Sequence, residues 1–374
     1  MIDQAERLLM LVMLHWFQNI ASLSGASYGF HADWMGNLSL QLQNIKLTHL
    51  AIPGSHDSGS YSLQPEHINL LDKDKFTRYF QMALNGSKKS SMGNLIYRWS
   101  KTQDLNITSQ LNLGVRYLDL RIAVDASKNC YIVHRLVGTS LDSILTQVKR
   151  FLLKHPKEII LLDFNHVYFD PSISKQAAQD TIMKSVVMTL DSRLCPCTAT
   201  SRYTLKAFWD LNCQILVFFA GFVERRGYKV CPEDFITSPF QENMFTQKST
   251  WLRFLNTNYK REKHNDAFYV TQGIMQPHWM EVAMAGISEQ ASLKNWVSDE
   301  ASNEMIKWLT SKQKNDLNIV IVDFVENHKF VETVLSLNNM KTNSNVIHGA
   351  MSWLINVTSV ILIWTIIDTI ILAL

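Results

Sequence analysis

Two histidines and an aspartate stand out as side chains that could do chemistry. His56 and Asp57 lie in Ile52-Pro-Gly-Ser-His-Asp-Ser-Gly59, directly after the apolar run 47–52, and His134 closes the segment Tyr-Ile-Val-His. Two imidazoles can act as base and acid on opposite sides of one reacting group. A single buried histidine is more often a hydrogen-bonded core residue, so the neighbouring charges decide between the two interpretations.

Two further acids and an arginine lie near the ends of other apolar segments. Asp119 and Arg121 are two residues apart in the run 115–122, so they share one face of a strand. Asp323 lies near the end of the run 318–324. Because the planar fork of an arginine matches the oxygens of a phosphate, this set favours phosphodiester or acyl chemistry.

Short apolar segments recur along the chain and are typical of buried parallel strands with helices between them. No glycine-rich phosphate loop follows the first of them, so we expect an α/β fold of the distorted (β/α)8 TIM-barrel type rather than a dinucleotide-binding sheet. An eighth strand is expected to be hidden, and 235–261 is expected to form loops at the barrel mouth. The predicted strands are 47–52, 115–124, 131–134, 158–165, 214–220, 268–271 and 318–324, and the clearest helix has its apolar face at Leu141, Ile144, Leu145, Val148, Phe151 and Leu152.

Composition indicates a folded globular protein. Apolar residues make up 47% and charged residues 18% of the 374 residues. The net charge of +3 is spread without a dense basic block, so nucleic acid is not an expected partner.

The five cysteines are irregularly spaced, which argues against a dense disulfide framework. Cys195-Pro-Cys197 lacks the second pair of ligands that a zinc site needs. We therefore expect free thiols in a reducing compartment.

Both ends of the chain are apolar. The run 8–17 precedes small residues, as in a signal peptide, but an amphipathic or core-packing helix fits it as well. The run 346–374 exceeds the roughly 20 residues that span a bilayer, so it is an anchor, an in-plane helix or a segment packed on the domain. The expected organisation is an apolar segment at 1–30, a barrel at 31–340 and a hydrophobic tail at 346–374.

Four motifs in order resemble the phosphatidylinositol-specific phospholipase C X-domain proteins, in particular the stand-alone X-domain group. They are IPGSHDSG, LGVRYLDLRIAV, YIVH and HPKEIILLDFNHVY, and the likeness runs from about Trp34 to Val334. The resemblance implies a distorted TIM barrel that cleaves the glycerol-side phosphodiester of an inositol phospholipid to diacylglycerol and an inositol (cyclic) phosphate.

The resemblance also implies roles for individual residues. His56 resembles the general base that takes the proton of the inositol 2-hydroxyl, with Asp323 as its orienting carboxylate. His134 resembles the general acid that protonates the departing diacylglycerol oxygen, and the two histidines exchange roles when water opens the cyclic phosphate. Arg121 resembles the arginine that neutralises the phosphate, and Asp57 would hold its fork.

No cofactor is expected. Relatives that use calcium have acidic residues where this chain has Arg121 and Phe164, and calcium prefers six or more oxygen ligands. We therefore expect metal-independent chemistry, with Arg121 in place of the ion.

Several positions concern substrate binding. Asp119 shares the strand face of the arginine, and Asn165 and His166 lie at another strand end, where inositol hydroxyls or loop capping are alternative roles. Arg135 stands where many relatives have glycine, and Ala220 lies near the position of a second substrate-binding arginine in bacterial relatives.

Two functions follow from this resemblance: an enzyme that acts at a membrane surface, or a catalytically weak domain that binds phosphoinositide or inositol phosphate as an adaptor. The expected location is cytoplasmic and membrane-associated, and secretion is the alternative.

Overall fold

The computed structural model describes most of residues 31–338, with gaps at 70, 72–88, 198–202, 223–226, 240–246, 260–266, 278–280, 283, 285–287, 289 and 313–315. By contacts the chain divides after Asn338, and the described residues belong to the first unit. The apolar segments predicted at 1–30 and 346–374 lie outside the described residues. No helix in the described part is long and apolar enough to cross a membrane.

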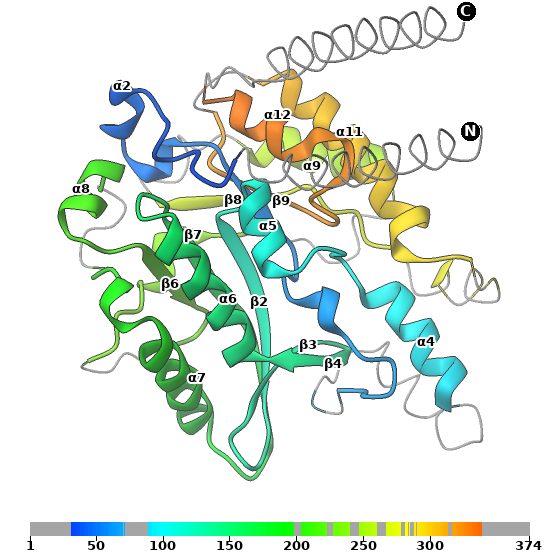
Figure 1. The fold of residues 1–374 in the computed structure, drawn as a ribbon. Coiled ribbons are helices and arrows are strands. Elements are labelled where there is room, and N and C mark those ends of the chain that lie inside the picture. Colours follow the sequence, from blue (N-terminus) through cyan, green and yellow to red (C-terminus); the bar gives the residue numbers. More distant parts are fainter. Residues whose placement is uncertain are drawn as a thin grey trace, which may run out of the picture. The chain divides into compact units, whose positions relative to one another are not determined.

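Parallel strands form the central barrel in the order β6-β5-β2-β1-β9-β8-β7 (Figure 1). The short segment 231–237 closes it, because Cys231 bridges to Phe218 of β6 while β7 pairs with β8. The predicted barrel is confirmed, and the hidden strand is β7. The strands are β1 (Ile52–Ser55), β2 (Tyr117–Val124), β5 (Ile160–Phe169), β6 (Ile215–Phe219), β7 (Ile236–Thr237), β8 (Phe268–Gln272) and β9 (Ile319–Val322).

Two strands depart from the parallel prediction. β3 (Cys130–His134) and β4 (Leu136–Ser140) are both antiparallel to their neighbours and extend from β2 as a meander. The segment 131–134 was expected to be a parallel strand of the barrel. The connection from β2 to β3 is too short for a crossover helix, which parallel neighbours require.

Helices follow most of the strands and cover the barrel (Figure 1). The predicted helix is α6, which buries all six residues of its predicted apolar face and begins where Ser140 Oγ accepts a hydrogen bond from Ser143 N. The segment 235–261 is not only loops, because it contains β7 and α9. The helices are α2 (Leu40–Gln43), α4 (Lys89–Ser100), α5 (Ile107–Leu113), α6 (Leu141–Lys154), α7 (Lys175–Leu190), α8 (Leu205–Asp210), α9 (Lys248–Asn258), α11 (Asp299–Thr310) and α12 (Phe330–Ser336).

The first strand begins later than predicted. Leu47–His49 is a single 3₁₀ turn, and the strand itself is Ile52–Ser55, so Pro53 and Gly54 belong to the strand. A Cβ on Gly54 would lie 2.8 Å from side-chain atoms of both Ile321 and Tyr117. Glycine is therefore required where β1 packs between β2 and β9.

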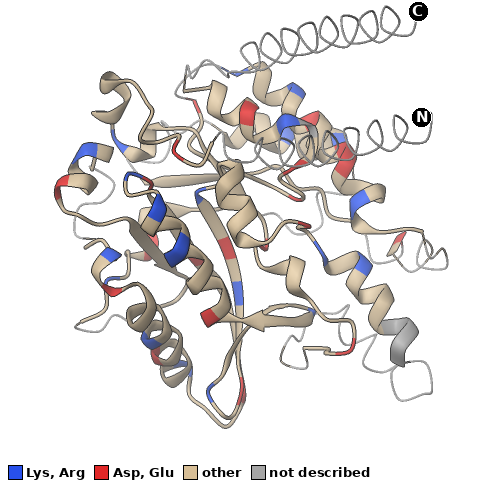
Figure 2. Ribbon diagram, in the orientation of Figure 1, with Lys and Arg blue, Asp and Glu red and all other residues tan. Residues whose placement is uncertain are grey.

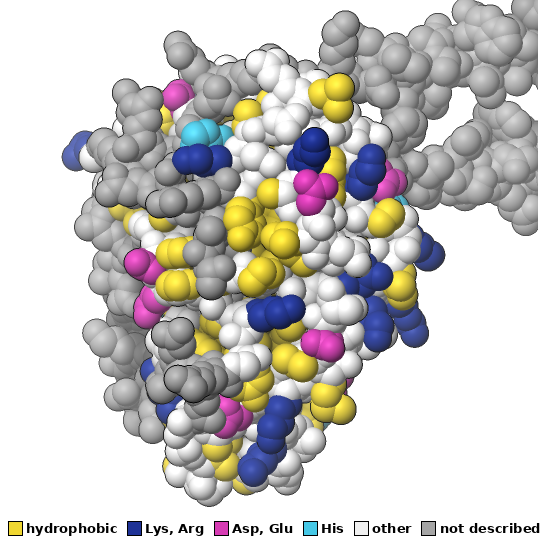
Figure 3. All heavy atoms as spheres, turned by 90° about the vertical axis from the view of Figure 1, so that its left-hand side faces the viewer, with side chains coloured by type: hydrophobic (Ala, Val, Ile, Leu, Met, Phe, Trp, Pro, Cys, Tyr) yellow, Lys and Arg dark blue, Asp and Glu magenta, His cyan; other side chains and the backbone are white. Residues whose placement is uncertain are grey.

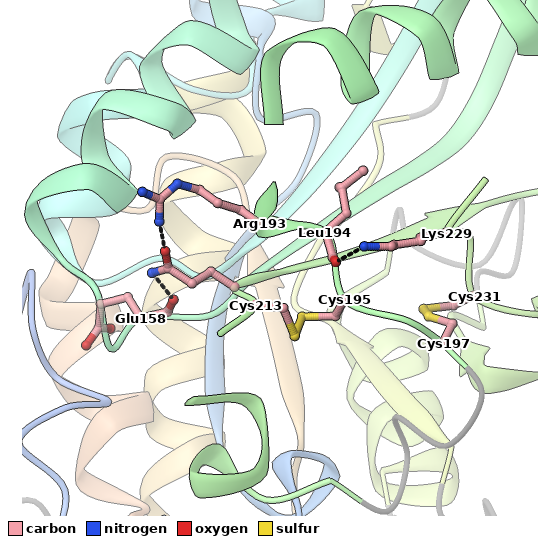
Figure 4. The surroundings of a disulfide bond; sticks show 9 residues. Glu158, Arg193, Leu194, Cys195, Cys197, Cys213, Lys229 and Cys231 are labelled. Carbon is pink, nitrogen blue, oxygen red and sulfur yellow. Dashed lines mark hydrogen bonds between the residues drawn. A yellow bond between two sulfur atoms is a disulfide. The ribbon is translucent and has the colours of Figure 1, made fainter. Parts of the chain in front are cut away.

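Disulfide bonds join four of the five cysteines, so the prediction of free thiols is wrong for these four. Cys195 pairs with Cys213, and Cys197 pairs with Cys231 (Figure 4). Cys130 is free and buried. The pairs join segments that meet only in the folded barrel, which cysteine spacing alone does not reveal.

Charged residues lie mainly on the helices and loops of the described chain, whereas β2 carries an acidic and a basic position near one another (Figure 2). Figure 3 shows one face, on which Lys and Arg are scattered among apolar, acidic and uncharged side chains. The charged pair on β2 lies in the barrel wall, as does the buried Asp163 of β5, and the pair belongs to the candidate site.

Candidate active site

His56 and Asp323 meet because they directly follow two adjacent parallel strands, β1 and β9. His56 Nδ1 lies 2.7 Å from Asp323 Oδ1. The other carboxylate oxygen of Asp323 accepts a hydrogen bond of 2.9 Å from Ser298 Oγ. Ser298 ends a π-helical turn, Lys294–Ser298, and its contact was not predicted because no sequence pattern places this turn against β9.

The carboxylate of Asp57 lies between the two histidines. Its Oδ2 is 3.3 Å from His56 Nε2 and 3.2 Å from His134 Nδ1. Its Oδ1 is 2.5 Å from Arg121 Nε. Asp57 has a φ of 41°, a strained conformation of the kind that gathers at functional sites. Burial alone would raise the pKa of Asp57, but Arg121 and the two histidines hold it well below its usual range.

His134 ends β3 and faces His56, with 6.3 Å between the ring centroids. Its Nδ1 lies 2.7 Å from the carbonyl oxygen of Ser100, to which only an N–H can donate. Its other ring nitrogen, Nε2, lies 3.5 Å from Arg135 NH1. The Nδ1 contact therefore orients the ring and leaves Nε2 for chemistry.

The segment after α4 holds both histidines and was not predicted to belong to the site. Thr102 Oγ1 and Gln103 Nε2 each donate to the carbonyl oxygen of His56 at 3.0 Å. Gln103 Nε2 also donates to Val322 O at the end of β9, again at 3.0 Å. Together with the Ser100 carbonyl, these contacts fix His56, His134 and the end of β9 relative to one another.

The two histidines titrate in opposite directions. Burial alone would lower the pKa of His56, but Asp57 and the hydrogen-bonded Asp323 outweigh it and raise this pKa to about 9. Burial lowers the pKa of His134 to about 3, with Arg121 and Arg135 acting in the same direction and Asp57 opposing them. At neutral pH the ligand-free site therefore carries its proton on His56.

Asp119, Asn165 and His166 form a chain of contacts beside the histidines. The register of β2 and β5 shifts between Leu120 and Arg121, and this bulge directs Asn165 toward β2. Asn165 Nδ2 donates to Asp119 Oδ1, and Asn165 Oδ1 lies 2.7 Å from Nδ1 of the exposed His166. Burial and the neighbouring Asp57 raise the pKa of Asp119 to about 6.

The structure also locates Phe164 and Ala220, two positions at which this chain differs from relatives that have an acidic residue or an arginine there. Phe164 is buried in β5, and Ala220 is exposed just after β6, where its N–H donates to Phe164 O at 3.2 Å. The short side chain of Ala220 adds no charge to this edge of the barrel.

His56, Asp57 and Asp119 have oxygen or nitrogen atoms within 4.8 Å of one another, as in a metal site. However, Asp57 already binds the guanidinium of Arg121. A cation at this point would face a fixed positive charge, so these three residues do not fit a calcium site of several carboxylates.

Comparison with known proteins gives one consistent family. The family model described as PI-PLC X 1 matches residues 76–338. PI-PLC X domain-containing protein 2 of Mus musculus is 30% identical over 331 residues, which is 86% of this chain and 92% of that protein. PI-PLC X domain-containing protein 3 of Homo sapiens is 28% identical over 324 residues, covering 85% of this chain and 97% of that protein.

Solved structures share the fold at low sequence identity. A phosphatidylinositol-specific phospholipase C from Staphylococcus aureus superimposes with a TM-score of 0.58 at 18% identity, covering 83% of this chain and 97% of that one. The enzyme of the same name from Listeria monocytogenes gives a TM-score of 0.53 at 19% identity, with 83% and 99% covered. The same barrel therefore underlies both bacterial enzymes and this chain.

Proposed function

The chain belongs to the PI-PLC X-domain family, and from this premise we propose that it is a metal-independent phosphodiesterase of the phosphoinositide phospholipase C type. Its substrate is an inositol phospholipid at a membrane surface, and its products are diacylglycerol and an inositol (cyclic) phosphate. The observation that carries the proposal is the cluster in which one carboxylate, Asp57, contacts both histidines and Arg121.

In the first step His56 Nε2 takes the proton of the inositol 2-hydroxyl, and this oxygen attacks the phosphorus. The bond from phosphorus to the glycerol oxygen breaks, and His134 Nε2 supplies the proton for the departing diacylglycerol. Asp323 stabilises the imidazolium that forms on His56, to which it is hydrogen-bonded. Arg121 neutralises the phosphorane oxygens, a preorganised electrostatic role.

In the second step the two histidines exchange roles. The ligand-free site already has the protonation states that this step needs, a charged His56 and a neutral His134. The neutral His134 takes a proton from water, the hydroxide oxygen attacks the cyclic phosphate, and the charged His56 returns its proton to the 2-oxygen. The first step requires the opposite distribution of protons. Substrate binding must therefore move the proton from His56 toward His134.

A connected group that runs from the buried Asp119 to the exposed His166 supports a proposal for the substrate contacts. Asp119, Asn165 and His166 form one connected group at the bulge of β5, and we assign them to the inositol hydroxyls. Ala220 adds no positive charge at the end of β6, which supports unphosphorylated phosphatidylinositol as the first substrate to test.

The two disulfides support a proposal for the compartment. Since two disulfides persist only in oxidising surroundings, we propose that the protein acts on the extracytoplasmic side of a membrane. This favours secretion, the alternative in the sequence analysis, over a cytoplasmic location.

Turnover of phosphatidylinositol in detergent micelles tests the proposal. His56→Ala and His134→Ala should each lower release of inositol cyclic phosphate by at least 100-fold, the size of a general acid–base contribution. His155→Ala is the matched control, because this histidine pairs with Asp33 away from the cluster. EGTA should leave the rate within about twofold, because no step uses a metal.

Two results would contradict the proposal. Wild-type rates in either cluster variant would remove the mechanism, and a calcium-restored loss in EGTA would remove the metal-independent site. Binding of inositol phosphate without turnover by the wild-type protein would instead identify the adaptor.

A further inference from the structure

Arg135 occupies an unusual backbone position. It is the single residue between β3 and β4, and His134 pairs with Leu136 across it. Its carbonyl oxygen accepts a hydrogen bond of 2.8 Å from Asn69 N, which fixes the junction. The side chain of Arg135 lies next to the imidazole of His134, with 3.5 Å between NH1 and Nε2.

The conformation of Arg135 would suit glycine. Its φ is 58°, in the left-handed region, where a residue with a Cβ loses about 1–2 kcal/mol relative to the right-handed conformation. Residues in this conformation cluster at active sites and ligand-binding segments. Lys128 and Asn212 also have a positive φ, in turns outside the cluster, so the conformation of Arg135 gains its meaning from its place directly after His134.

Each histidine of the site faces one guanidinium through the same ring nitrogen. Arg121 NH2 lies 3.4 Å from His56 Nε2, and Arg135 NH1 lies 3.5 Å from His134 Nε2. A phosphate between the two Nε2 atoms would meet one guanidinium from each side. Guanidinium groups bind phosphate oxygens through two parallel N–H donors, which a single lysine cannot reproduce.

We propose that Arg135 is a second phosphate-binding guanidinium, paired with His134 in the ligand-free protein and transferred to an oxygen of the phosphodiester when substrate binds. This inference rests on the proposed function, because it assigns Arg135 to the leaving-group side of the same phosphate.

The transfer explains how the protons of the site redistribute. In the ligand-free protein the groups that face His134 are Asp57, Arg121, His56, the Ser100 carbonyl and Arg135. Arg121, Arg135 and His56 each lower the pKa of His134. A bound phosphate adds negative charge beside Nε2 and takes up the guanidinium of Arg135. Both changes favour the N–H that the acid donates to the diacylglycerol oxygen.

Binding of inorganic phosphate tests Arg135 without turnover. Chemical-shift titration of the full-length protein with phosphate should give a dissociation constant about tenfold higher in Arg135→Gly than in the wild type, and an intermediate one in Arg135→Lys. Glycine accepts the backbone conformation, so this variant should fold. The control is Lys128→Gly, which removes a charge at a φ of 66° in the turn between β2 and β3.

The histidine signals provide a second readout. The His134 signal, assigned by its loss in His134→Ala, should titrate at a higher pH in Arg135→Gly than in the wild type, because one opposing positive charge is gone. In turnover of phosphatidylinositol, Arg135→Gly should raise KM about tenfold. Lys128→Gly should change neither the pH at which His134 titrates nor the KM.

The outcomes separate this inference from the proposed function. If the wild-type protein does not turn over phosphatidylinositol but Arg135→Gly weakens phosphate binding, the enzyme is refuted and the phosphate contact stands. If turnover depends on both histidines but Arg135→Gly binds phosphate as the wild type does, Arg135 is not a phosphate ligand. An unshifted His134 titration in Arg135→Gly would refute its pairing with His134.

Discussion

Asp323 is held at both of its oxygens, and this makes it more than a neighbour of the base. One oxygen lies 2.7 Å from His56 Nδ1 and the other accepts from Ser298 Oγ at 2.9 Å. Asp323 and Ser298 are buried and His56 is nearly so, and the carboxylate therefore has little freedom to rotate away from His56. In the proposed mechanism Ser298 would therefore act through Asp323, as a positioning residue.

Replacing Ser298 by alanine should lower kcat about tenfold while KM changes little. The reason is that one oxygen of a buried carboxylate loses its donor and the base loses its fixed partner, and tenfold corresponds to about 1.4 kcal/mol. Steady-state turnover of phosphatidylinositol micelles measures the two constants separately.

Ser302→Ala is the matched control. This serine is equally buried one turn further along, but its Oγ donates to the backbone oxygen of Asp323, at 3.4 Å. Its kcat should stay within about twofold of wild type. Equal losses in both variants would mean that Ser298 supports only the packing of α11.

The charged residues of the site were predictable, but the groups that hold them were not. His56, Asp57 and Asp323 follow apolar runs, and parallel strands bring such ends together. His134 also ends an apolar run, but the antiparallel β3 brings it to the site. Ser298 and the carbonyl of Ser100 lie in segments whose positions depend on contacts far along the chain. Polar residues of these common types carry no local pattern that separates them from ordinary surface positions.

β1 fixes the base because it is short and enclosed by two neighbours. Ile52–Ser55 pairs with β2 on one side and β9 on the other, and the chain turns at once into His56 and Asp57. Any shift of this strand therefore moves the base relative to Asp323. Gly54 is the residue whose missing side chain permits the close packing.

Gly54→Ala should destabilise the barrel by about 1–3 kcal/mol and should lower turnover even where the protein is still folded. A Cβ there would lie 2.8 Å from both Ile321 and Tyr117, so β1 must move. Chemical unfolding gives the stability, and turnover at a temperature where the variant is folded gives the activity.

Gly36→Ala controls for the loss of a glycine, because its Cβ would first meet the exposed side chain of Lys157 at 3.1 Å. Its stability and turnover should stay near wild type. If Gly54→Ala unfolds as wild type does, β1 accommodates the methyl group and the packing argument is wrong.

Strands with both faces buried were the easiest elements to predict, and their direction was the hardest. Apolar runs located β2, β5, β6, β8 and β9, since the barrel buries most of each strand, although β5 is buried only in its first half. The run 131–134 looks the same in sequence but is antiparallel, because its direction depends on the short connection from β2. β7 has two residues, too few for any periodic pattern.

The barrel as a whole is weakest between β6 and β8. In the described residues, the two strands are joined there through one bridge at Cys231 and the two residues of β7. Both disulfides lie at this point: Cys195–Cys213 ties the preceding segment to the start of β6, and Cys197–Cys231 ties that segment to the closing one (Figure 4). The bonds therefore reinforce the part of the barrel with the fewest strand hydrogen bonds.

Cys197→Ser with Cys231→Ser should lower the free energy of unfolding by about 3 kcal/mol, because the unfolded chain regains the freedom that the loop closure removed. Dithiothreitol should lower the melting temperature of the wild type and turnover with it, whereas Cys130→Ser, which lacks only the free buried thiol, should remain as sensitive to reductant as the wild type.

Alkylation of the unreduced, denatured protein should label one cysteine. Labelling of all five would show that the protein carries no disulfide and would remove the argument for an oxidising compartment. A melting temperature that reductant does not change would show that the closure between β6 and β8 does not depend on these bonds.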